Sequence, residues 1–443
     1  MQRANREHIP VRIGHAKGAG AFGYFQVTHN VSKYTRSAFL QPNTRTDVVV
    51  RFSTQVGEIG SADTTIDAKG FAVKFKTLDG IFDFVGLNMA VFGHKDPILL
   101  PDLLHSRMKN PVTHVQDINM FWDMAAERTE TLLFILMFFS KTAYIKSYTY
   151  MDGHAIHTFK LVNAKYEPTF AKFIFTSDAQ NKKYFNDTVE ALTTAGFYPE
   201  FLTQDLYDLI AKKEFPSWTL NLQVMTEEQA KNFKYSIFDP TKYWNTTEFP
   251  LIPVGKLVLD RNPTNYFNDV EQAAYSPANL VPGIEATPDR LLQGRLFAYR
   301  DAQFYRLGRN HNELPVNSCP FAIRNYERDG FMNVGENGGS GPNYFPNNYN
   351  GPTNNRDRYY KELPFEVCGT ADRNLGEEDN FSQCKAYVNS LSVSDQQTLL
   401  ANMAFSFVNV NDATVKRVIE KMIMPISRDF ANRFKQELSK IGK

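Results

Sequence analysis

The sequence predicts an α+β fold, with an antiparallel β-barrel as its core, a wrapping segment around it and a helical region at the C-terminus. Three observations carry this prediction. Alternating apolar and polar stretches fill the first half, a proline-punctuated stretch of little periodicity follows, and helical patterns return near the end. The 443 residues suffice for a sizeable core. We expect three parts, at residues 1–250, 251–384 and 385–443.

The strand candidates of the first part show a period of two residues. In "DVVVRFS" (47–53), Val49, Arg51 and Ser53 would point to one face and Val48, Val50 and Phe52 to the other. The same alternation occurs at residues 71–77, 157–163, 171–177 and 218–225. Turn residues between these stretches favour an antiparallel barrel or sandwich. Helical patterns interrupt the strands at 115–140 and 186–213.

Composition excludes some classes of protein. The net charge of +1 gives no indication of a nucleic-acid partner. The longest apolar run, "LLFILMFF" (132–139), is too short to span a bilayer. The N-terminal "MQRANREHIP" has no apolar signal region, and the C-terminal "SKIGK" is not the peroxisomal tripeptide. We therefore expect an intracellular location, with the compartment open.

The stretch "QGRLFAYRDAQFYRLG" (293–308) indicates a metal-binding phenol. On a helix, Arg295 and Tyr299 are four residues apart and touch. A guanidinium beside a phenol stabilises the phenolate form. Because phenolate is unusual in proteins and is a good ligand for a metal ion, this pair predicts a metal site.

A second candidate group surrounds the glycine-rich stretch "RIGHAKGAGAFGYFQVTH" (12–29). Its glycines would allow a flat ligand to approach the backbone near His15, although one histidine there fits a structural role equally well. Three arginines, Arg12, Arg51 and Arg306, lie close in sequence to candidate groups. They would suit the two propionates of haem, whereas each taken singly is also typical of a surface charge.

These motifs together resemble the monofunctional haem catalases. The resemblance rests on "REHIPVRIGHAKGAGAFGYFQVTH", "VRFST", "KGFAVKF", "HTFKLVNA", "PSWTLNLQVMT", the long stretch from "FPLIPVGKLVLDRNP" to "QGRLFAYRD", and "PNYFPN". It covers residues 6 to 350 and, more loosely, the helical region. It implies the catalase fold, bound haem, and decomposition of hydrogen peroxide to water and oxygen through a ferryl intermediate.

The resemblance also implies roles for single residues. It makes Tyr299, on the wrapping segment, the proximal iron ligand and Arg295 its charge partner, with His157 and Asp289 behind them. It makes His15 the distal acid–base and Ser53 its hydroxyl support. The arginines at 12, 51 and 306 become propionate anchors, and Asp67 becomes a carboxylate of the substrate channel.

The distal side departs from the family at the residue that donates a hydrogen bond to peroxide. Family members carry asparagine there, whereas a gap-free comparison gives Leu87. Asn88 is one residue late, and a slip of one residue in a strand turns the side chain to the other face. A β-bulge would return Asn88 to the catalytic position, so Asn88 stays a candidate donor.

Other differences from the family leave further functions open. Gly14, Gly93 and Leu100 replace bulkier residues, which predicts a wider and more apolar pocket. The alternatives to hydrogen peroxide decomposition are therefore an enzyme acting on fatty acid hydroperoxides and a haem-binding relative with little activity. The family's nucleotide-binding positions are occupied by Leu133, Thr142, Ile174 and Tyr243, so we predict that NADPH does not bind. A homo-oligomer, dimer or tetramer, is an open expectation.

Overall fold

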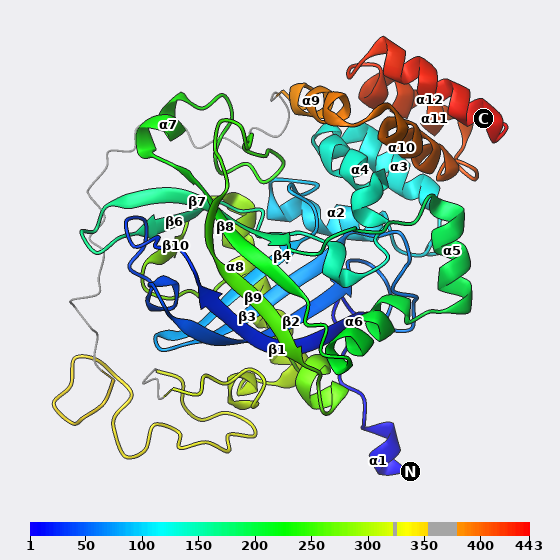
Figure 1. The fold of residues 1–443 in the computed structure, drawn as a ribbon. Coiled ribbons are helices and arrows are strands. Elements are labelled where there is room, and N and C mark those ends of the chain that lie inside the picture. Colours follow the sequence, from blue (N-terminus) through cyan, green and yellow to red (C-terminus); the bar gives the residue numbers. More distant parts are fainter. Residues whose placement is uncertain (322–325, 353–378) are drawn as a thin grey trace.

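The computed structural model of the chain describes residues 1–321, 326–352 and 379–443 (Figure 1). Residues 322–325 and 353–378, which belong to the expected wrapping segment, lie outside the described residues.

The strands are β1 (Gly18–Val27), β2 (Arg45–Thr54), β3 (Lys69–Thr77), β4 (Gly80–Leu87), β5 (Gly153–His154), β6 (Phe159–Val162), β7 (Pro168–Ser177), β8 (Ser217–Met225), β9 (Ile252–Arg261) and β10 (Ile284–Ala286). The α-helices are α1 (Gln2–Asn5), α2 (Leu100–His105), α3 (Ile118–Glu127), α4 (Leu132–Phe139), α5 (Thr188–Phe197), α6 (Phe201–Ala211), α7 (Glu227–Asn232), α8 (Arg290–Leu307), α9 (Ser382–Ser390), α10 (Val393–Phe405), α11 (Asp412–Val418) and α12 (Arg428–Lys440).

The strands form one antiparallel sheet that closes into a barrel. Their order is β10-β6-β7-β5-β4-β3-β2-β1-β9-β8, and an additional pairing of β8 with β7 closes the strands from β7 to β8 into a ring. The short strands β6 and β10 extend from β7 outside this ring. The predicted antiparallel β-barrel is thus confirmed.

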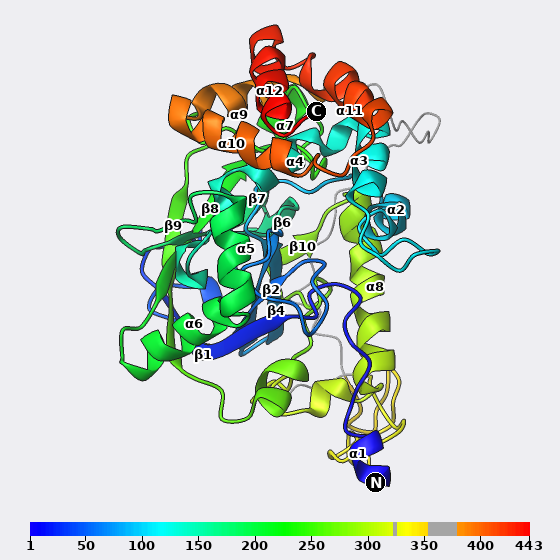
Figure 2. The ribbon, with the colours of Figure 1, turned by 90° about the vertical axis from the view of Figure 1, so that its right-hand side faces the viewer.

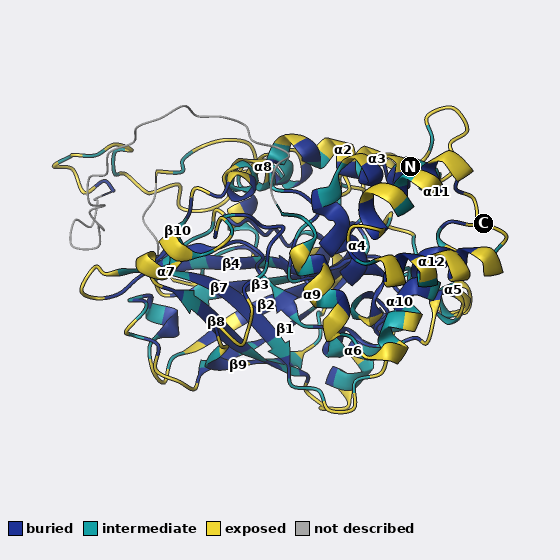
Figure 3. Ribbon diagram, turned by 90° about the horizontal axis from the view of Figure 1, so that it is seen from above, coloured by how far each residue is buried: buried dark blue, intermediate teal, exposed yellow. Residues whose placement is uncertain are grey.

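Aromatic side chains fill the barrel interior. Phe52 lies against the rings of Phe71 and Tyr148, at centroid distances of 5.0 and 5.1 Å, and Phe71 stacks on Phe175 at 5.4 Å. The face of β2 that carries Phe52 therefore points inward, as the alternation predicts. The opposite face, with Arg51 and Ser53, is also buried, and Figure 3 shows that the strands are buried along most of their length.

A helix rather than solvent covers that outer face. Figure 2 shows α8 running alongside the barrel next to β2 and β4. The C-terminal helices gather at one end of the molecule, where α10 packs against α4 and α12. Within the described residues, none of the helices combines the length and the apolar character needed to cross a membrane.

The helical patterns expected at 115–140 and 186–213 are confirmed. Each range is broken once, the first between α3 and α4 and the second between α5 and α6. The second break lies at Tyr198, whose φ of −136° is non-helical because Pro199 follows it. The barrel also continues past the boundary expected at residue 250, since β9 pairs with β1 and β8. The division into three parts otherwise stays a prediction.

Candidate active site

A cavity of about 310 Å³ lies between the outer face of the barrel and α8. Two cross-strand rows form the barrel wall. Ser53, Gly70 and Leu87 lie opposite one another in β2, β3 and β4, and the next row on the same face contains Arg51, Ala72 and Val85. On α8, the lining residues recur at helical spacing: Leu291, Gly294, Arg295, Ala298, Tyr299, Ala302, Gln303 and Arg306. The cavity is thus set by strand register on one wall and by one helix face on the other.

The α8 wall presents the predicted phenol. Nη2 of Arg295 donates a hydrogen bond to the Tyr299 hydroxyl oxygen at 2.7 Å and a longer one to the Val85 carbonyl at 3.3 Å. The guanidinium also lies 4.9 Å from the centroid of the Tyr299 ring. The pairing expected from the i, i+4 spacing is therefore present, and both side chains line the cavity.

Behind this pair, a buried histidine and a carboxylate fix the start of α8. Nδ1 of His157 lies 2.5 Å from Oδ2 of Asp289, and the other carboxylate oxygen accepts a hydrogen bond from the Leu292 backbone N–H at 3.1 Å. Asp289 is therefore the N-cap of the helix that carries Tyr299. Burial lowers the pKa of His157, and the carboxylate opposes that shift. Neither side chain lines the cavity, so both position rather than contact a ligand.

The barrel wall presents His15. Its Nδ1 lies 2.9 Å from Oγ of Ser53, and its backbone N–H donates to the Gln55 carbonyl at 2.9 Å. The residue has a φ of 63°, in the left-handed region. Burial, followed by the charge of Arg51, lowers the pKa of His15 to about 4. The imidazole is therefore neutral at pH 7 and able to accept a proton.

A glycine makes this histidine–serine pair possible. A Cβ placed on Gly70 would lie 2.3 Å from Oγ of Ser53 and 2.7 Å from Nδ1 of His15. Such contacts are shorter than real Cβ atoms show, so any side chain at position 70 would displace the pair. Gly70 was not among the predicted site residues, because its role depends on the strand register.

The structure corrects the prediction for Asn88. The pairing of β3 with β4 runs without a bulge from Thr77–Gly80 to Gly70–Leu87, so Leu87 lies on the cavity face. The Asn88 side chain is turned away: Nδ2 donates to the Thr142 carbonyl at 2.9 Å and Oδ1 accepts from the Lys69 N–H at 2.8 Å. Both ends of the amide are thus occupied by backbone, and Asn88 cannot be the distal donor in this arrangement.

The other replaced positions are divided between two cavities. Gly14 and Leu100 line the main cavity, together with the unpredicted Phe92 and Leu104, so its distal wall is apolar as expected. Gly93 instead lines a separate small cavity. It therefore does not widen the main one.

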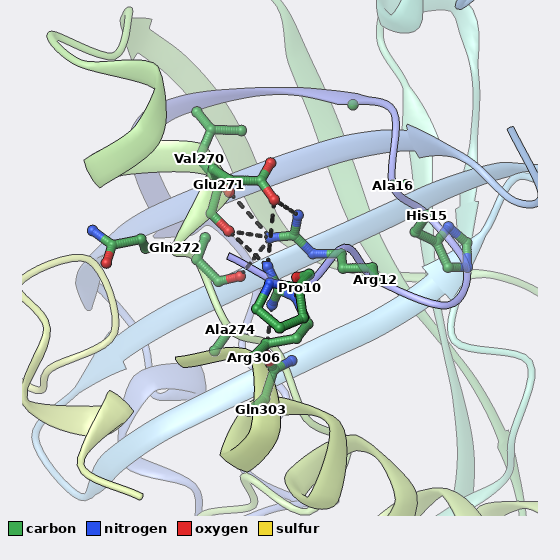
Figure 4. A network of polar contacts seen from close by, with 12 residues as sticks. Pro10, Arg12, His15, Ala16, Val270, Glu271, Gln272, Ala274, Gln303 and Arg306 are labelled. Carbon is green, nitrogen blue, oxygen red and sulfur yellow. Dashed lines mark hydrogen bonds and ion pairs between the residues drawn. The ribbon is translucent and has the colours of Figure 1, made fainter. Parts of the chain in front are cut away.

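The three predicted arginines all line the cavity. Ile13, next to Arg12, also lines it and is 67% exposed, so the cavity reaches the surface beside Arg12. Figure 4 shows Arg12 and Arg306 converging on Glu271. Nη1 of Arg12 lies 3.3 Å from Oε1 of this carboxylate, and Nη2 of Arg306 lies 3.5 Å from the same oxygen. Arg51 donates to the carbonyls of His15 and Ala16. Arg51 and Arg306 are buried and Arg12 is mostly buried, so the arginines are parts of the site rather than surface charges.

The sequence analysis did not identify Glu271 as a site residue, because it follows β9 in a stretch without periodicity. Even with this carboxylate, the site keeps an excess of positive charge: three guanidinium groups face one glutamate. Nε of Arg51 also has no hydrogen-bond partner among the described residues although it is buried. An anionic ligand at this end would satisfy both the charge and this donor.

These observations fit haem. The cavity is within the size range of cofactor pockets. Its arginine end suits propionates, and its α8 wall offers a phenol oxygen to iron. In the described part of the chain, His, Cys, Asp and Glu nowhere gather in a group of three that could hold a metal ion. Among the residues that line the cavity, Tyr299 would hold the iron of haem through its phenol oxygen.

Comparison with known proteins identifies the family. The sequence model of the family described as Catalase matches residues 1–351. The catalase of Drosophila melanogaster is 46% identical over 445 residues, which cover 99% of this chain and 87% of that protein. The catalase of Methanosarcina barkeri is 44% identical over 438 residues, which cover 98% of this chain and 86% of that protein.

Solved structures show the same fold. A fungal catalase superposes with a TM-score of 0.94 at 36% identity, covering 99% of this chain and 90% of that chain. Catalase A from Saccharomyces cerevisiae also gives a TM-score of 0.94 at 36% identity, with coverage of 99% and 91%. By this family match and these identities, the chain belongs to the catalase family.

Proposed function

We propose that the protein decomposes hydrogen peroxide to water and oxygen with haem held in the described cavity. One observation carries this proposal: the Arg295–Tyr299 pair on the α8 wall and the His15–Ser53 pair on the barrel wall line the same enclosed space. The catalases named above support hydrogen peroxide over the other substrates that the sequence left open.

Each residue has a defined task in this reaction. Tyr299 would hold the iron, and Arg12, Arg51 and Arg306 would hold the propionates. When bound, haem supplies the two-electron redox chemistry that peroxide cleavage requires. His15, neutral at pH 7, takes the proton from one peroxide oxygen and returns it to the other, which is general acid–base catalysis. Ser53 keeps the imidazole oriented through its bond to Nδ1.

Leu87 removes the side chain that would donate a hydrogen bond to peroxide beside His15. Losing one well-placed donor at such a site costs about 10²–10³ in rate. We therefore expect turnover below that of a catalase with asparagine at this position. The neighbouring lining residues Phe92, Leu100 and Leu104 are apolar and cannot replace this donor.

The experiment compares the wild-type protein with Leu87→Asn after reconstitution with haem. Oxygen evolution from hydrogen peroxide and consumption of a fatty acid hydroperoxide are measured on both. We expect oxygen evolution from the wild type above that of free haem, and a several-fold or greater rise in the variant. Consumption of only the lipid hydroperoxide would favour the alternative enzyme, and no turnover of either would favour a haem-binding protein.

Three further expectations stay predictions: that NADPH does not bind, that the protein is a homo-oligomer, and that it is intracellular. Sedimentation of the haem-loaded protein tests the oligomer. Equilibrium dialysis against NADPH tests the nucleotide.

A further inference from the structure

A buried polar cluster on the distal wall has no task in the proposed reaction. Its inner member is Gln55, which lines the cavity and is 6% exposed. The Gln55 carbonyl also accepts the hydrogen bond from the backbone N–H of His15. This residue is therefore attached both to the cavity surface and to the catalytic histidine.

Arg107 connects Gln55 to a second buried group. Nη1 of Arg107 donates to Oε1 of Gln55 at 3.1 Å, and Nη2 donates to Oδ1 of Asp67 at 2.9 Å. The same guanidinium lies over the ring of Phe138, 5.2 Å from its centroid. Arg107 follows α2 by two residues, and Leu104 within that helix lines the cavity. One side chain thus ties the α2 segment to the segment that carries Gln55.

The pairing neutralises Asp67. This carboxylate was expected to stand in the substrate channel, but its side chain is 2% exposed and does not line the cavity. Its second oxygen accepts from the Val56 N–H at 2.7 Å, so both oxygens are bound. A buried carboxylate needs such partners, because removing one leaves an uncompensated charge.

The charge of Asp67 reaches His15. It raises the pKa of the imidazole, against burial and against the charges of Arg51, Arg295 and Arg12, which lower it. Arg107, which is ion-paired with Asp67, and Lys69, whose pKa the same carboxylate raises, both limit how strongly Asp67 acts on the histidine.

The contacts continue from the cavity wall to solvent. The Arg107 side chain is 11% exposed, and two residues further along, Nζ of Lys109 pairs with Oε1 of Glu58 at 2.9 Å on the surface. Residues 107–109 are thus joined to residues 55–58 at two points, by Arg107 with Gln55 and by Lys109 with Glu58. Arg107 also joins them to Asp67. Together these contacts close the wall beside His15.

We propose that Arg107 is the residue that controls entry to the distal side of the cavity, by binding Gln55 and Asp67 at once. It holds the α2 segment against the segment of residues 55–58 and cancels the charge next to His15. Release of this side chain would open a route for small neutral solutes directly to His15. The inference rests on the proposed function in one respect, that His15 is the group that meets the substrate.

The test measures the association rate of hydrogen cyanide with the haem-loaded protein, followed by the change in the haem absorption spectrum. Hydrogen cyanide is small and neutral like peroxide, and His15 must be neutral to take up its proton. We expect Arg107→Gln to raise the rate by about threefold or more, in the range of coupling found between contacting residues. We also expect the acid limb of the rate to move to higher pH, because Asp67 without Arg107 keeps only Lys69 as a nearby cation and raises the pKa of His15 further.

Lys109→Gln is the matched control, since it removes the same charge two residues away from an exposed pair. We expect it to leave both the rate and the pH profile unchanged. Arg107→Lys, which keeps the charge but cannot bind both partners as a fork, should give an intermediate rate. The double variant with Asp67→Asn should be no faster than Arg107→Gln alone, because the two side chains act as one unit.

Equal association rates in Arg107→Gln, Arg107→Lys and Lys109→Gln would overturn the inference. It would also be overturned if the rate changes of the single variants Arg107→Gln and Asp67→Asn multiplied in the double variant. These outcomes leave the proposed function standing. A wild-type protein that takes up no haem would instead contradict the proposed function, and with it the basis of this inference.

Discussion

The two walls of the cavity are built in different ways. The α8 wall holds Tyr299 through a series of polar contacts, from Asp289 at the helix N-cap to Arg295 at the phenol. On the barrel wall, Ser53 is the side chain that holds the imidazole of His15 among the described residues, and the apolar Leu87 lies in the same cross-strand row. The phenol is thus held by a connected series of polar contacts, whereas the imidazole is not.

This difference indicates where the protein tolerates change. Each contact on the α8 wall depends on its neighbours, since the same helix carries the N-cap, the arginine and the phenol. On the barrel wall, leucine at position 87 leaves the strand pairing and the His15–Ser53 bond intact. Substitution there alters the chemistry of the pocket without disturbing the fold.

The largest expected effect, a loss of haem affinity, comes from Tyr299→Phe on the α8 wall. The change removes the phenol oxygen that would hold the iron, so we expect haem affinity to fall more than about a hundredfold, since loss of an outer-shell partner alone costs 10–100-fold. Titration with haem followed by absorption spectroscopy measures this. Tyr305→Phe is the control, because Tyr305 lies on the same helix but is 54% exposed. Retained affinity and an unaltered spectrum in Tyr299→Phe would disprove ligation by Tyr299.

A smaller effect is expected from Gly70→Ala, which changes the barrel wall beside His15. The new methyl group would occupy the space between Ser53 and His15, and a displacement of about 1 Å at a catalytic group costs on the order of 10² in rate. We expect peroxide turnover to fall by that factor while haem is still taken up. Gly93→Ala provides the comparison, because its nearest neighbours would be 3.6 Å away. If both variants turn over peroxide equally, the His15–Ser53 pair has no role in catalysis.

The smallest effect concerns His94, near the distal wall, where it lies 4.8 Å from the ring of Phe92. Among the described residues, neither of its ring nitrogens has a hydrogen-bond partner, and burial lowers its pKa to about 4, with the nearby Asp96 opposing the shift. The unfolded chain binds this proton at higher pH than the native protein. Stability contributed by neutral His94 is therefore lost as pH falls from above 6.5 towards 4.

His94→Leu should remove this dependence. Between pH 7 and pH 5 we expect the free energy of unfolding to fall by about 2 kcal/mol less in the variant than in the wild type. Denaturant unfolding at the two pH values measures the difference, with His8→Leu as the control because His8 is exposed. An unchanged pH dependence would show that His94 does not titrate on unfolding in this range.

The sequence by itself determined the antiparallel strands of the barrel and the phenol–arginine pair. The period of two in β2 divided its residues correctly between two faces, and the helical spacing of Arg295 and Tyr299 gave their contact. Both are local periodicities, which survive in any tertiary arrangement. Resemblance to the family added the partners that are distant along the chain, such as His157 and Asp289.

Only the tertiary structure decided which residue completes the distal wall and what surrounds it. The choice between Leu87 and Asn88 depended on whether the pairing of β3 with β4 contains a bulge, and the register shows none. Glu271 between two arginines, and Arg107 between Gln55 and Asp67, join segments that are remote in sequence. A sequence fixes the alternation of side chains along each strand, but contacts between segments depend on how the closed barrel and α8 bring them together.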